Sequence, residues 1–168
     1  ADGDAVVIQR EFPGLFDQYQ SVLRRARGEG KPIIFEIDDL LWFLPERHPN
    51  RIAHDYASVL LPMFECLTEA DLVTVTTPML KEVLAEYNHN ITVLPNYFDD
   101  NLWRLRPPDQ ISNSYEAVTI GFMGTVSHRP DLEYIQPVLL KLVERYGHKI
   151  RFHFWGGQPS IELLQLSY

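Results

Sequence analysis

The stretch Ile120–Leu132 reads I-G-F-M-G-T-V-S-H-R-P-D-L and carries the strongest structural signal in this sequence. An apolar run from Val118 to Gly124 stops abruptly within it, and a helix-start signal follows at Asp131. A strand that turns through a glycine into a helix offers free backbone N–H groups where the strand ends. Such groups bind phosphate and other anions. The stretch therefore predicts an anion-binding turn between a strand and a helix.

The side chains of this turn are candidate ligands of a diphosphate. Gly124 permits close approach of the backbone, and Thr125 and Ser127 add hydroxyl donors. His128 and Arg129 supply positive charge, which strengthens hydrogen bonds to phosphate oxygens. The alternative is a plain strand-to-helix turn, in which the aspartate that follows acts only as a helix cap.

Strands and helices alternate along most of the chain. Short apolar or β-branched runs predict strands at residues 5–8, 33–37, 71–76, 91–94, 118–124 and 150–156. Apolar residues at helical spacing predict helices at residues 15–28, 50–69, 78–87 and 132–146. Pro62 predicts a kink or break in the second helix, and Thr77 before a proline is the expected cap of the third. Strands separated by helices of this length form parallel βαβ units.

A change of composition divides the chain. Residues 107–116 contain prolines and several polar residues, which is typical of a linker. Residues 1–106 and 117–168 then belong to two domains, and neither has the strands of a complete doubly wound sheet. We therefore expect an α/β protein made of parts of two Rossmann-like parallel-sheet domains, cut from a longer chain.

Composition and charge exclude several classes of protein. The net charge of −8 argues against a nucleic-acid binder, because phosphate backbones are held by clustered Lys and Arg. Cys66 is the only cysteine, so the chain forms no internal disulfide or multi-cysteine zinc site and fits a reducing cytoplasm. No apolar run approaches the roughly 20 residues that cross a bilayer. Peripheral contact with a membrane stays open.

Polar residues follow each predicted strand. In open parallel sheets, ligands bind beyond the carboxyl ends of the strands. We therefore expect one cleft to collect the side chains at these ends, which are Gln9, Arg10, Asp38, Asp39, Thr76, Thr77, Asn96, Gly124 and Thr125.

The adjacent acids Asp38 and Asp39 require an explanation, because two neighbouring carboxylates repel each other. They could hold a sugar hydroxyl, act as a base or form an acidic metal pocket. Alternatively, one caps the segment that follows and the other is solvated. Their spacing does not match the separated carboxylates of a metal-dependent nucleotide-sugar site, and the histidines form no metal signature, so we predict no metal.

Four segments together resemble a known family: F-E-I-D-D-L-L-W, A-D-L-V-T-V-T-T-P-M-L, V-L-P-N and I-G-F-M-G-T-V-S-H-R-P-D-L-E, at residues 35–42, 70–80, 93–96 and 120–133. In their order and spacing the chain resembles the group 1 glycosyltransferases of family 4, which have the GT-B fold. It is most similar to the branch of polysaccharide and O-antigen assembly enzymes. The likeness extends over residues 5–156.

This resemblance implies two Rossmann-like domains with a cleft between them. The amino-terminal domain takes a glycan or lipid-linked acceptor, which assigns Asp38 and Asp39 to the acceptor side or the cleft. The carboxy-terminal domain takes the nucleotide sugar, with its diphosphate near Gly124, Thr125, His128 and Arg129. Members of this kind retain the anomeric configuration and need neither a bound metal nor another cofactor. No residue is identified as the catalytic base.

The sequence departs from the family pattern in two places. Many members carry an arginine after the loop glycine and a lysine soon after, whereas Thr125 takes the first position here and the nearest cations are His128 and Arg129. The family's two glutamates separated by seven residues, which bind the donor sugar and ribose, are absent. We therefore expect the isolated chain to be catalytically inactive, and its severed sheets to favour a dimer or swapped oligomer.

Two other readings compete with a transferase. A non-catalytic α/β module, kept for interaction or architecture, fits the missing glutamates. A receiver-like domain would bind magnesium at Asp38 and Asp39, but it also requires a lysine at the end of a later strand. No predicted strand ends in lysine, so the receiver-like reading ranks last.

Overall fold

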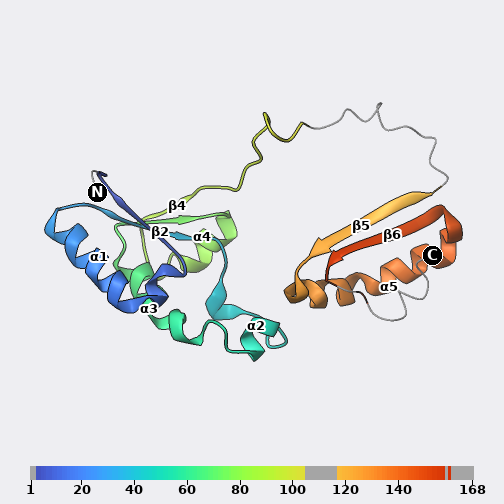
Figure 1. Ribbon diagram of the computed structural model, residues 1–168, viewed down its shortest axis with the longest axis horizontal. Helices are drawn as coiled ribbons and strands as arrows, with labels where there is room; N and C mark the ends of the chain where they lie inside the picture. The colour runs from blue at the N-terminus through green and yellow to red at the C-terminus, as the bar shows by residue number, and fades with distance from the viewer. Residues whose placement is uncertain (1–2, 105–116, 158, 160–168) are drawn as a thin grey trace. The chain divides into compact units, whose positions relative to one another are not determined.

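The computed structural model describes residues 3–104, 117–157 and 159, and it is a mixed α/β structure (Figure 1). Parallel strands lie in two small sheets and helices alternate with them along the chain, which confirms the predicted fold class. The chain divides into two compact units, one of Ala1–Pro45 with His54–Asp99 and one of Glu46–Ala53 with Asp100–Tyr168. The predicted linker, residues 107–116, lies outside the described residues, so the predicted domain bounds stay a prediction.

The first unit is built on a four-stranded parallel sheet with the strand order β1-β2-β3-β4. Its strands are β1 (Val6–Gln9), β2 (Ile33–Ile37), β3 (Leu72–Val75) and β4 (Ile91–Val93). The connections contain α1 (Phe16–Gly28), α3 (Ala57–Glu69), α4 (Pro78–Leu84) and short 3-10 turns at Phe12–Gly14 and Leu41–Phe43. Crossovers between parallel strands are right-handed, so a strand order that follows the chain places the connecting helices on one face.

The two faces of this sheet differ in burial. Alternate residues of each strand point to opposite faces. Phe35 and Val73 are fully buried beneath the helices, whereas Val7 on the opposite face is 62% exposed. The buried face carries one continuous core, formed by Ile8, Ile33, Phe35, Ile37, Val73, Val75 and Ile91 of the strands and by Tyr19, Leu23, Met63, Cys66, Leu67, Leu80 and Leu84 of the helices. The helix-covered face therefore holds this unit together.

Local signals place the helix ends of the first unit. Thr77 caps α4 as predicted, because its Oγ1 accepts a hydrogen bond of 3.1 Å from the Leu80 N–H. The predicted helix at residues 50–69 is instead two helices, α2 (Pro49–Ile52), whose residues are grouped with the second unit, and α3, which belongs to the first. The break lies near His54, whose φ of 57° is left-handed and cannot continue a right-handed helix. A break at Pro62 is therefore contradicted, since Pro62 lies inside α3, and a kink at Pro62 stays a prediction.

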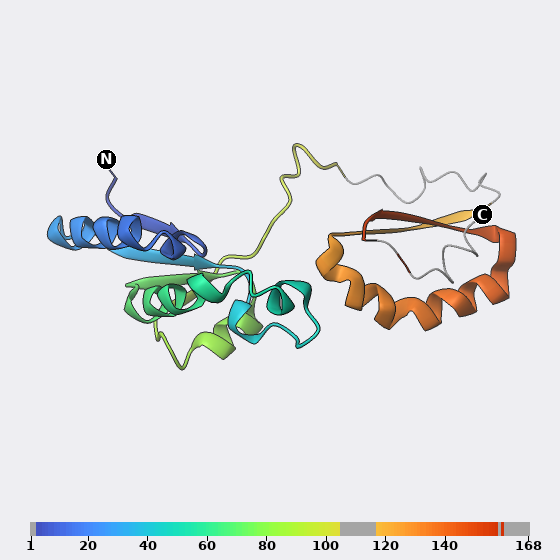
Figure 2. The same ribbon diagram turned by 60° about the horizontal axis from the view of Figure 1, so that its bottom comes forward.

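The second unit contains two parallel strands, β5 (Val118–Gly124) and β6 (Ile150–Gly156), joined by α5 (Arg129–Tyr146). Short 3-10 turns, Val126–His128 and Gly147–Lys149, lie at the two ends of α5. Figure 2 shows α5 running along one face of the two strands. Its core consists of Leu132, Leu139 and Phe152, with Ile120, Phe122, Leu140, Leu142, Val143, Ile150 and Phe154 packed around them. Across residues 3–104 and 117–157, none of the helices has the length and hydropathy needed to cross a membrane.

Asn88 is a buried polar residue that joins three parts of the first unit. Its Nδ2 donates to the carbonyl oxygens of Leu67 and Ala70, both at 2.9 Å. Its Oδ1 accepts from the Asn90 N–H at 2.8 Å. The Asn88 amide thereby pairs carbonyls at the carboxyl end of α3, which lack partners within that helix. The side chain fixes the end of α3 to the turn before β4.

We expect Asn88→Ala to lower the free energy of unfolding of the first unit by about 3 kcal/mol, because each buried polar group left unpaired costs about 1–3 kcal/mol. Thiol labelling of Cys66 in increasing urea isolates this unit, since Cys66 is the only cysteine and is 1% exposed. Burial raises the pKa of its thiol to about 12, so the folded form stays protonated and unreactive. His89→Ala, at an exposed neighbouring position, is the control. Equal stability of the two variants would contradict a structural role for Asn88.

Candidate functional site

Two strand ends of the first sheet meet in an ion-pair cluster. Arg10 follows β1, and its Nη1 donates to Asp38 Oδ1 at 2.6 Å and to Asp39 Oδ2 at 2.5 Å. Thr76, after β3, donates from Oγ1 to the Asp38 carbonyl oxygen at 3.2 Å. The structure therefore brings together three of the predicted strand-end features. The guanidinium between the acids supplies the reason why two carboxylates stand side by side.

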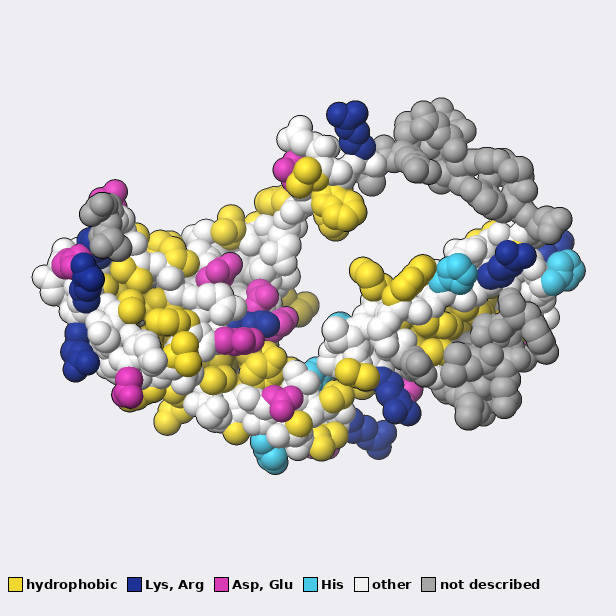
Figure 3. All heavy atoms as spheres, viewed as in Figure 1, with side chains coloured by type: hydrophobic (Ala, Val, Ile, Leu, Met, Phe, Trp, Pro, Cys, Tyr) yellow, Lys and Arg dark blue, Asp and Glu magenta, His cyan; other side chains and the backbone are white. Residues whose placement is uncertain are grey.

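The charges of this cluster are partly balanced and partly desolvated. The Arg10 side chain is 17% exposed, against 48% for Asp38 and 62% for Asp39. Burial lowers the pKa of Arg10, but the hydrogen bond to Asp39 and the charges of Asp38, Asp39 and Glu11 outweigh it, so the pKa is raised overall. Figure 3 shows acidic side chains gathered around a basic one on this unit. The cluster keeps an excess of carboxylate oxygens that can accept hydrogen bonds from hydroxyl groups.

The sequence left open an acidic metal pocket at Asp38 and Asp39. Across the described parts of the chain, no group of three or more His, Cys, Asp or Glu side chains is arranged to hold a metal ion. Divalent cations in proteins take several oxygen ligands. The observed contacts of Asp38 and Asp39 are hydrogen bonds accepted from Arg10.

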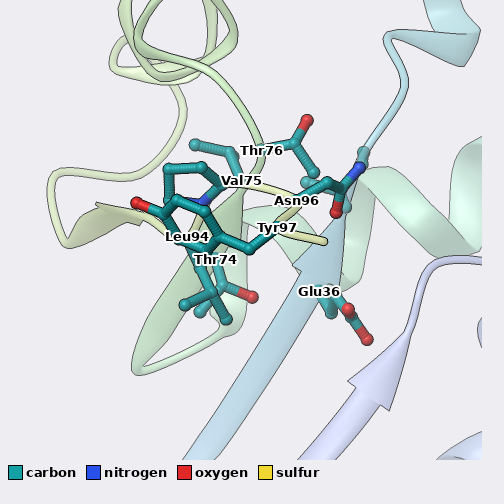
Figure 4. A pocket seen from close by; sticks show the side chains of 9 residues that line it. Glu36, Thr74, Val75, Thr76, Leu94, Asn96 and Tyr97 are labelled. Atoms are coloured by element: carbon teal, nitrogen blue, oxygen red, sulfur yellow. The ribbon is translucent and has the colours of Figure 1, made fainter. Parts of the chain in front are cut away.

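Asn96, the polar residue after β4, lines a pocket beside this cluster. The pocket has a volume of about 370 Å³ and is lined by Glu36, Ile37, Thr74, Val75, Thr76, Leu94, Pro95, Asn96 and Tyr97 (Figure 4). Glu36, Thr74 and Tyr97 are site residues that the sequence did not indicate. Glu36 and Thr74 could have been found in the sequence, because each is a polar residue within an otherwise apolar strand.

The turn after β5 has the predicted strand-to-helix geometry. β5 ends at Gly124, the 3-10 turn Val126–His128 follows, and α5 begins at Arg129. The predicted residues Gly124, Thr125, His128 and Arg129 therefore lie together at the carboxyl end of β5 and the amino end of α5. Helix amino ends favour anions through their free N–H groups and their dipole.

The glycines at the ends of β5 and β6 set how closely the two strands approach. Gly157 N–H donates to the Gly124 carbonyl oxygen at 2.6 Å. Gly156 has a φ of +86°, and a Cβ there would lie 2.2 Å from that same oxygen. A Cβ on Gly124 would lie 3.0 Å from the Cβ of His128, so this glycine makes room for the histidine. Gly156 and Gly157 were not among the predicted site residues, although a glycine pair at a strand end is a turn signal.

The cations of this loop are paired with acids on the first turns of α5. His128 Nδ1 lies 2.9 Å from Asp131 Oδ2, and Arg129 Nε donates to Glu133 Oε1 at 2.9 Å. The side chains of both pairs are more than half exposed. Exposed ion pairs contribute only about 0–1 kcal/mol, so a diphosphate can compete for both cations. The hydroxyl oxygens of Thr125 and Ser127 lie 2.6 Å apart and can be shared in the same way.

The expectation that Asp131 marks the helix start needs correction. The helix begins at Arg129, and Asp131 lies in its first turn. Pro130 fits the first turn because its missing N–H has no partner there and its φ is already helical. Asp131 contacts the His128 side chain instead of capping the helix.

A double-mutant cycle tests the ion pairs of Arg10. We expect Arg10→Met and Asp39→Asn to couple by about 1 kcal/mol in the free energy of unfolding, the upper end for partly exposed pairs. Cys66 labelling in urea measures the cycle, and the coupling should shrink in about 1 M NaCl because salt screens exposed charges. Arg24→Met, at an exposed position on α1, is the matched control. A coupling of zero that does not respond to salt would show that Arg10 does not hold the acid pair.

Gly156→Ala tests the close approach of β5 and β6. We expect a loss of more than about 2 kcal/mol, because the left-handed φ costs about 1–3 kcal/mol and the Cβ also strikes the Gly124 oxygen. Hydrogen exchange of the β5 and β6 amides measures the loss within this unit. Gly147→Ala is the control, since its φ is +52° but no heavy atom lies within 4 Å of the added Cβ. Equal losses of stability for the two variants would show that contact with the Gly124 oxygen is not the cause.

Comparison with known proteins does not identify a family for this chain. No family model matches the sequence, and no curated protein matches it. The candidate sites therefore rest on the residues and their geometry.

Proposed function

We propose that this chain is part of a glycosyltransferase that moves a sugar from a nucleotide-sugar donor to a glycan or lipid-linked acceptor, with retention of configuration. The observation that carries the proposal is the turn from Gly124 to Arg129. There β5 ends in a glycine, and a short turn leads to the amino end of an 18-residue helix. The turn and the first residue of the helix carry hydroxyl groups and cations. The sequence resemblance to the family 4 glycosyltransferases supports the same assignment.

In this proposal the turn acts electrostatically, by stabilising the negative charge of the leaving diphosphate. Departure of a nucleoside diphosphate leaves negative charge on its oxygens, and preorganised N–H dipoles and cations lower the energy of that charge. His128 and Arg129 flank the start of α5, where the helix dipole acts in the same direction. A diphosphate bound there would take over the places of Asp131 and Glu133 as the partners of these cations.

On the acceptor side we assign Asp38 and Asp39 to binding. Their carboxylate oxygens, held by Arg10, can accept hydrogen bonds from acceptor hydroxyls. They are assigned to neither the catalytic base nor a metal. The family's glutamate pair is absent from this sequence, so we expect the chain to bind the donor without transferring its sugar. Donor binding is therefore the property to measure.

A second candidate is a non-catalytic interaction module. It is favoured by the exposure of large apolar side chains on the strands, with Val7 at 62%, Met123 at 84% and Trp155 at 53% exposed. Parallel sheets are normally covered on both faces, so such side chains invite a covering partner. This candidate would be favoured if the chain bound no nucleoside diphosphate and associated with itself.

Calorimetric titration with UDP and GDP tests the proposal. We expect one of the two to bind, and Gly124→Val to weaken that binding at least about tenfold, because the valine side chain displaces His128 and crowds the backbone that approaches the phosphates. Gly28→Ala is the control, since an added Cβ there meets no heavy atom within 4 Å. Uridine and guanosine, which lack phosphate, should bind far more weakly. The absence of binding at millimolar nucleotide would overturn donor binding by this chain.

The ion pair between Arg129 and Glu133 provides a second test, in which two variants should change the nucleotide affinity in opposite directions. Arg129→Gln should weaken nucleotide binding, whereas Glu133→Gln should strengthen it by releasing Arg129 from its partner. A change of fold would move both variants in the same direction. Opposite shifts therefore identify Arg129 as a phosphate ligand, and unchanged affinity in both variants excludes it.

A further inference from the structure

We propose that the pocket at the carboxyl edge of the first sheet binds a neutral polyhydroxylated ring, such as a sugar. It joins the ends of three strands, with Glu36 from β2, Thr74 and Thr76 from or after β3, and Asn96 and Tyr97 after β4. Its volume of about 370 Å³ is within the range of small-ligand sites, about 300–1000 Å³. The site is independent of the Gly124 turn and stands whether or not that turn binds a nucleotide.

The strand register places the two polar residues of the sheet face together. Glu36 and Thr74 are paired across β2 and β3. Both alternate with buried neighbours, so they point away from the core, and both line the pocket. Strands of parallel sheets are normally apolar on both faces. A carboxylate and a hydroxyl at adjacent positions on such a face point to a polar ligand.

The polar groups of the pocket match hydroxyl groups in kind. Glu36 accepts hydrogen bonds, Thr74 both donates and accepts, and the Asn96 amide does the same through separate atoms. Thr76 Oγ1 donates to the Asp38 carbonyl, and its lone pairs remain acceptors. A hydroxyl is both donor and acceptor, so neighbouring hydroxyls of a ring can satisfy such a mixed set.

Charge narrows the class of ligand further. Among the described residues that line the pocket, Glu36 carries the only charge. A single carboxylate repels phosphates and carboxylates, and it can accept hydrogen bonds from two adjacent hydroxyls. Glu36 therefore disfavours a phosphate or carboxylate in the part of the ligand that enters the pocket.

Apolar groups complete the site. Leu94 is 61% exposed and Tyr97 is 83% exposed beside the pocket. A tyrosine ring offers an apolar face with a polar tip, which suits the C–H face of a sugar ring and its hydroxyl rim. The pocket thus combines a stacking surface with hydrogen-bonding groups from the strand ends.

Amide chemical-shift titration of the whole 168-residue chain tests the proposal, with methyl α-glucoside and uridine as the probes. The glucoside presents a hexose ring, and uridine presents a ribose without phosphate. We expect one or both to shift the amides of Glu36, Thr74, Thr76 and Tyr97. Binding of the glucoside alone identifies a hexose ligand, and binding of uridine alone identifies the ribose of a nucleoside. No shift at these amides up to about 100 mM of either probe, well beyond a millimolar dissociation constant, overturns the proposal.

Matched variants make the test specific. Glu36→Gln and Thr74→Val should each weaken the binding at least about tenfold. Glutamine replaces one charged acceptor oxygen by a donor, and valine removes the hydroxyl that bonds the ligand. Glu82→Gln on α4 and Thr92→Val on β4 carry the same changes at exposed positions outside the lining and should leave the affinity unchanged. Equal effects of lining and control variants, or shifts of the pocket amides by inorganic phosphate, would contradict a neutral polyol site. The spectrum of each variant also shows whether it is folded.

Discussion

Parallel pairing between neighbouring strands is the constraint on which the other features of this structure depend. In the first sheet β1, β2, β3 and β4 lie side by side in chain order, and each runs in the same direction as its neighbour. Their carboxyl ends must therefore share one edge, and the connecting helices must return along the same face. This is why Arg10, Asp38, Thr76 and Asn96 come to one edge from distant parts of the chain. The polar pair Glu36 and Thr74 lies on the opposite face of the sheet, away from the buried core.

Charge balance is the second theme. Two adjacent carboxylates are tolerated because Arg10 bridges them, and its partial burial strengthens that contact. On the second unit, His128 and Arg129 each face an acid on α5. At either place the charged side chains already form ion pairs with each other. A ligand that binds there must therefore replace one member of an existing ion pair. Such exchange is easiest where the pairs are exposed, as they are on α5.

The succession of elements could be predicted because its signals are local. The predicted bounds of β2, β5 and β6 are those of the structure. Thr77 followed by a proline marked the start of α4 correctly. The same local reasoning failed where two signals competed. Pro62 suggested a kink or a break, and the helix breaks near His54 instead. Asp131 suggested a helix start, whereas α5 begins at Arg129.

The sequence by itself therefore determined the α/β class, the alternation of strands and helices, and the position of a glycine turn before α5. It also placed polar residues at the strand ends, since periodicity, caps and turn residues act between near neighbours. The tertiary structure decided which of those residues touch. Arg10 meets Asp38 across 28 positions of sequence, and Gly156 approaches Gly124 only because β5 and β6 are parallel and in register. The pocket of Glu36, Thr74 and Asn96 likewise exists only when three strands stand side by side, because no local pattern fixes the contacts between strands that are distant in the chain.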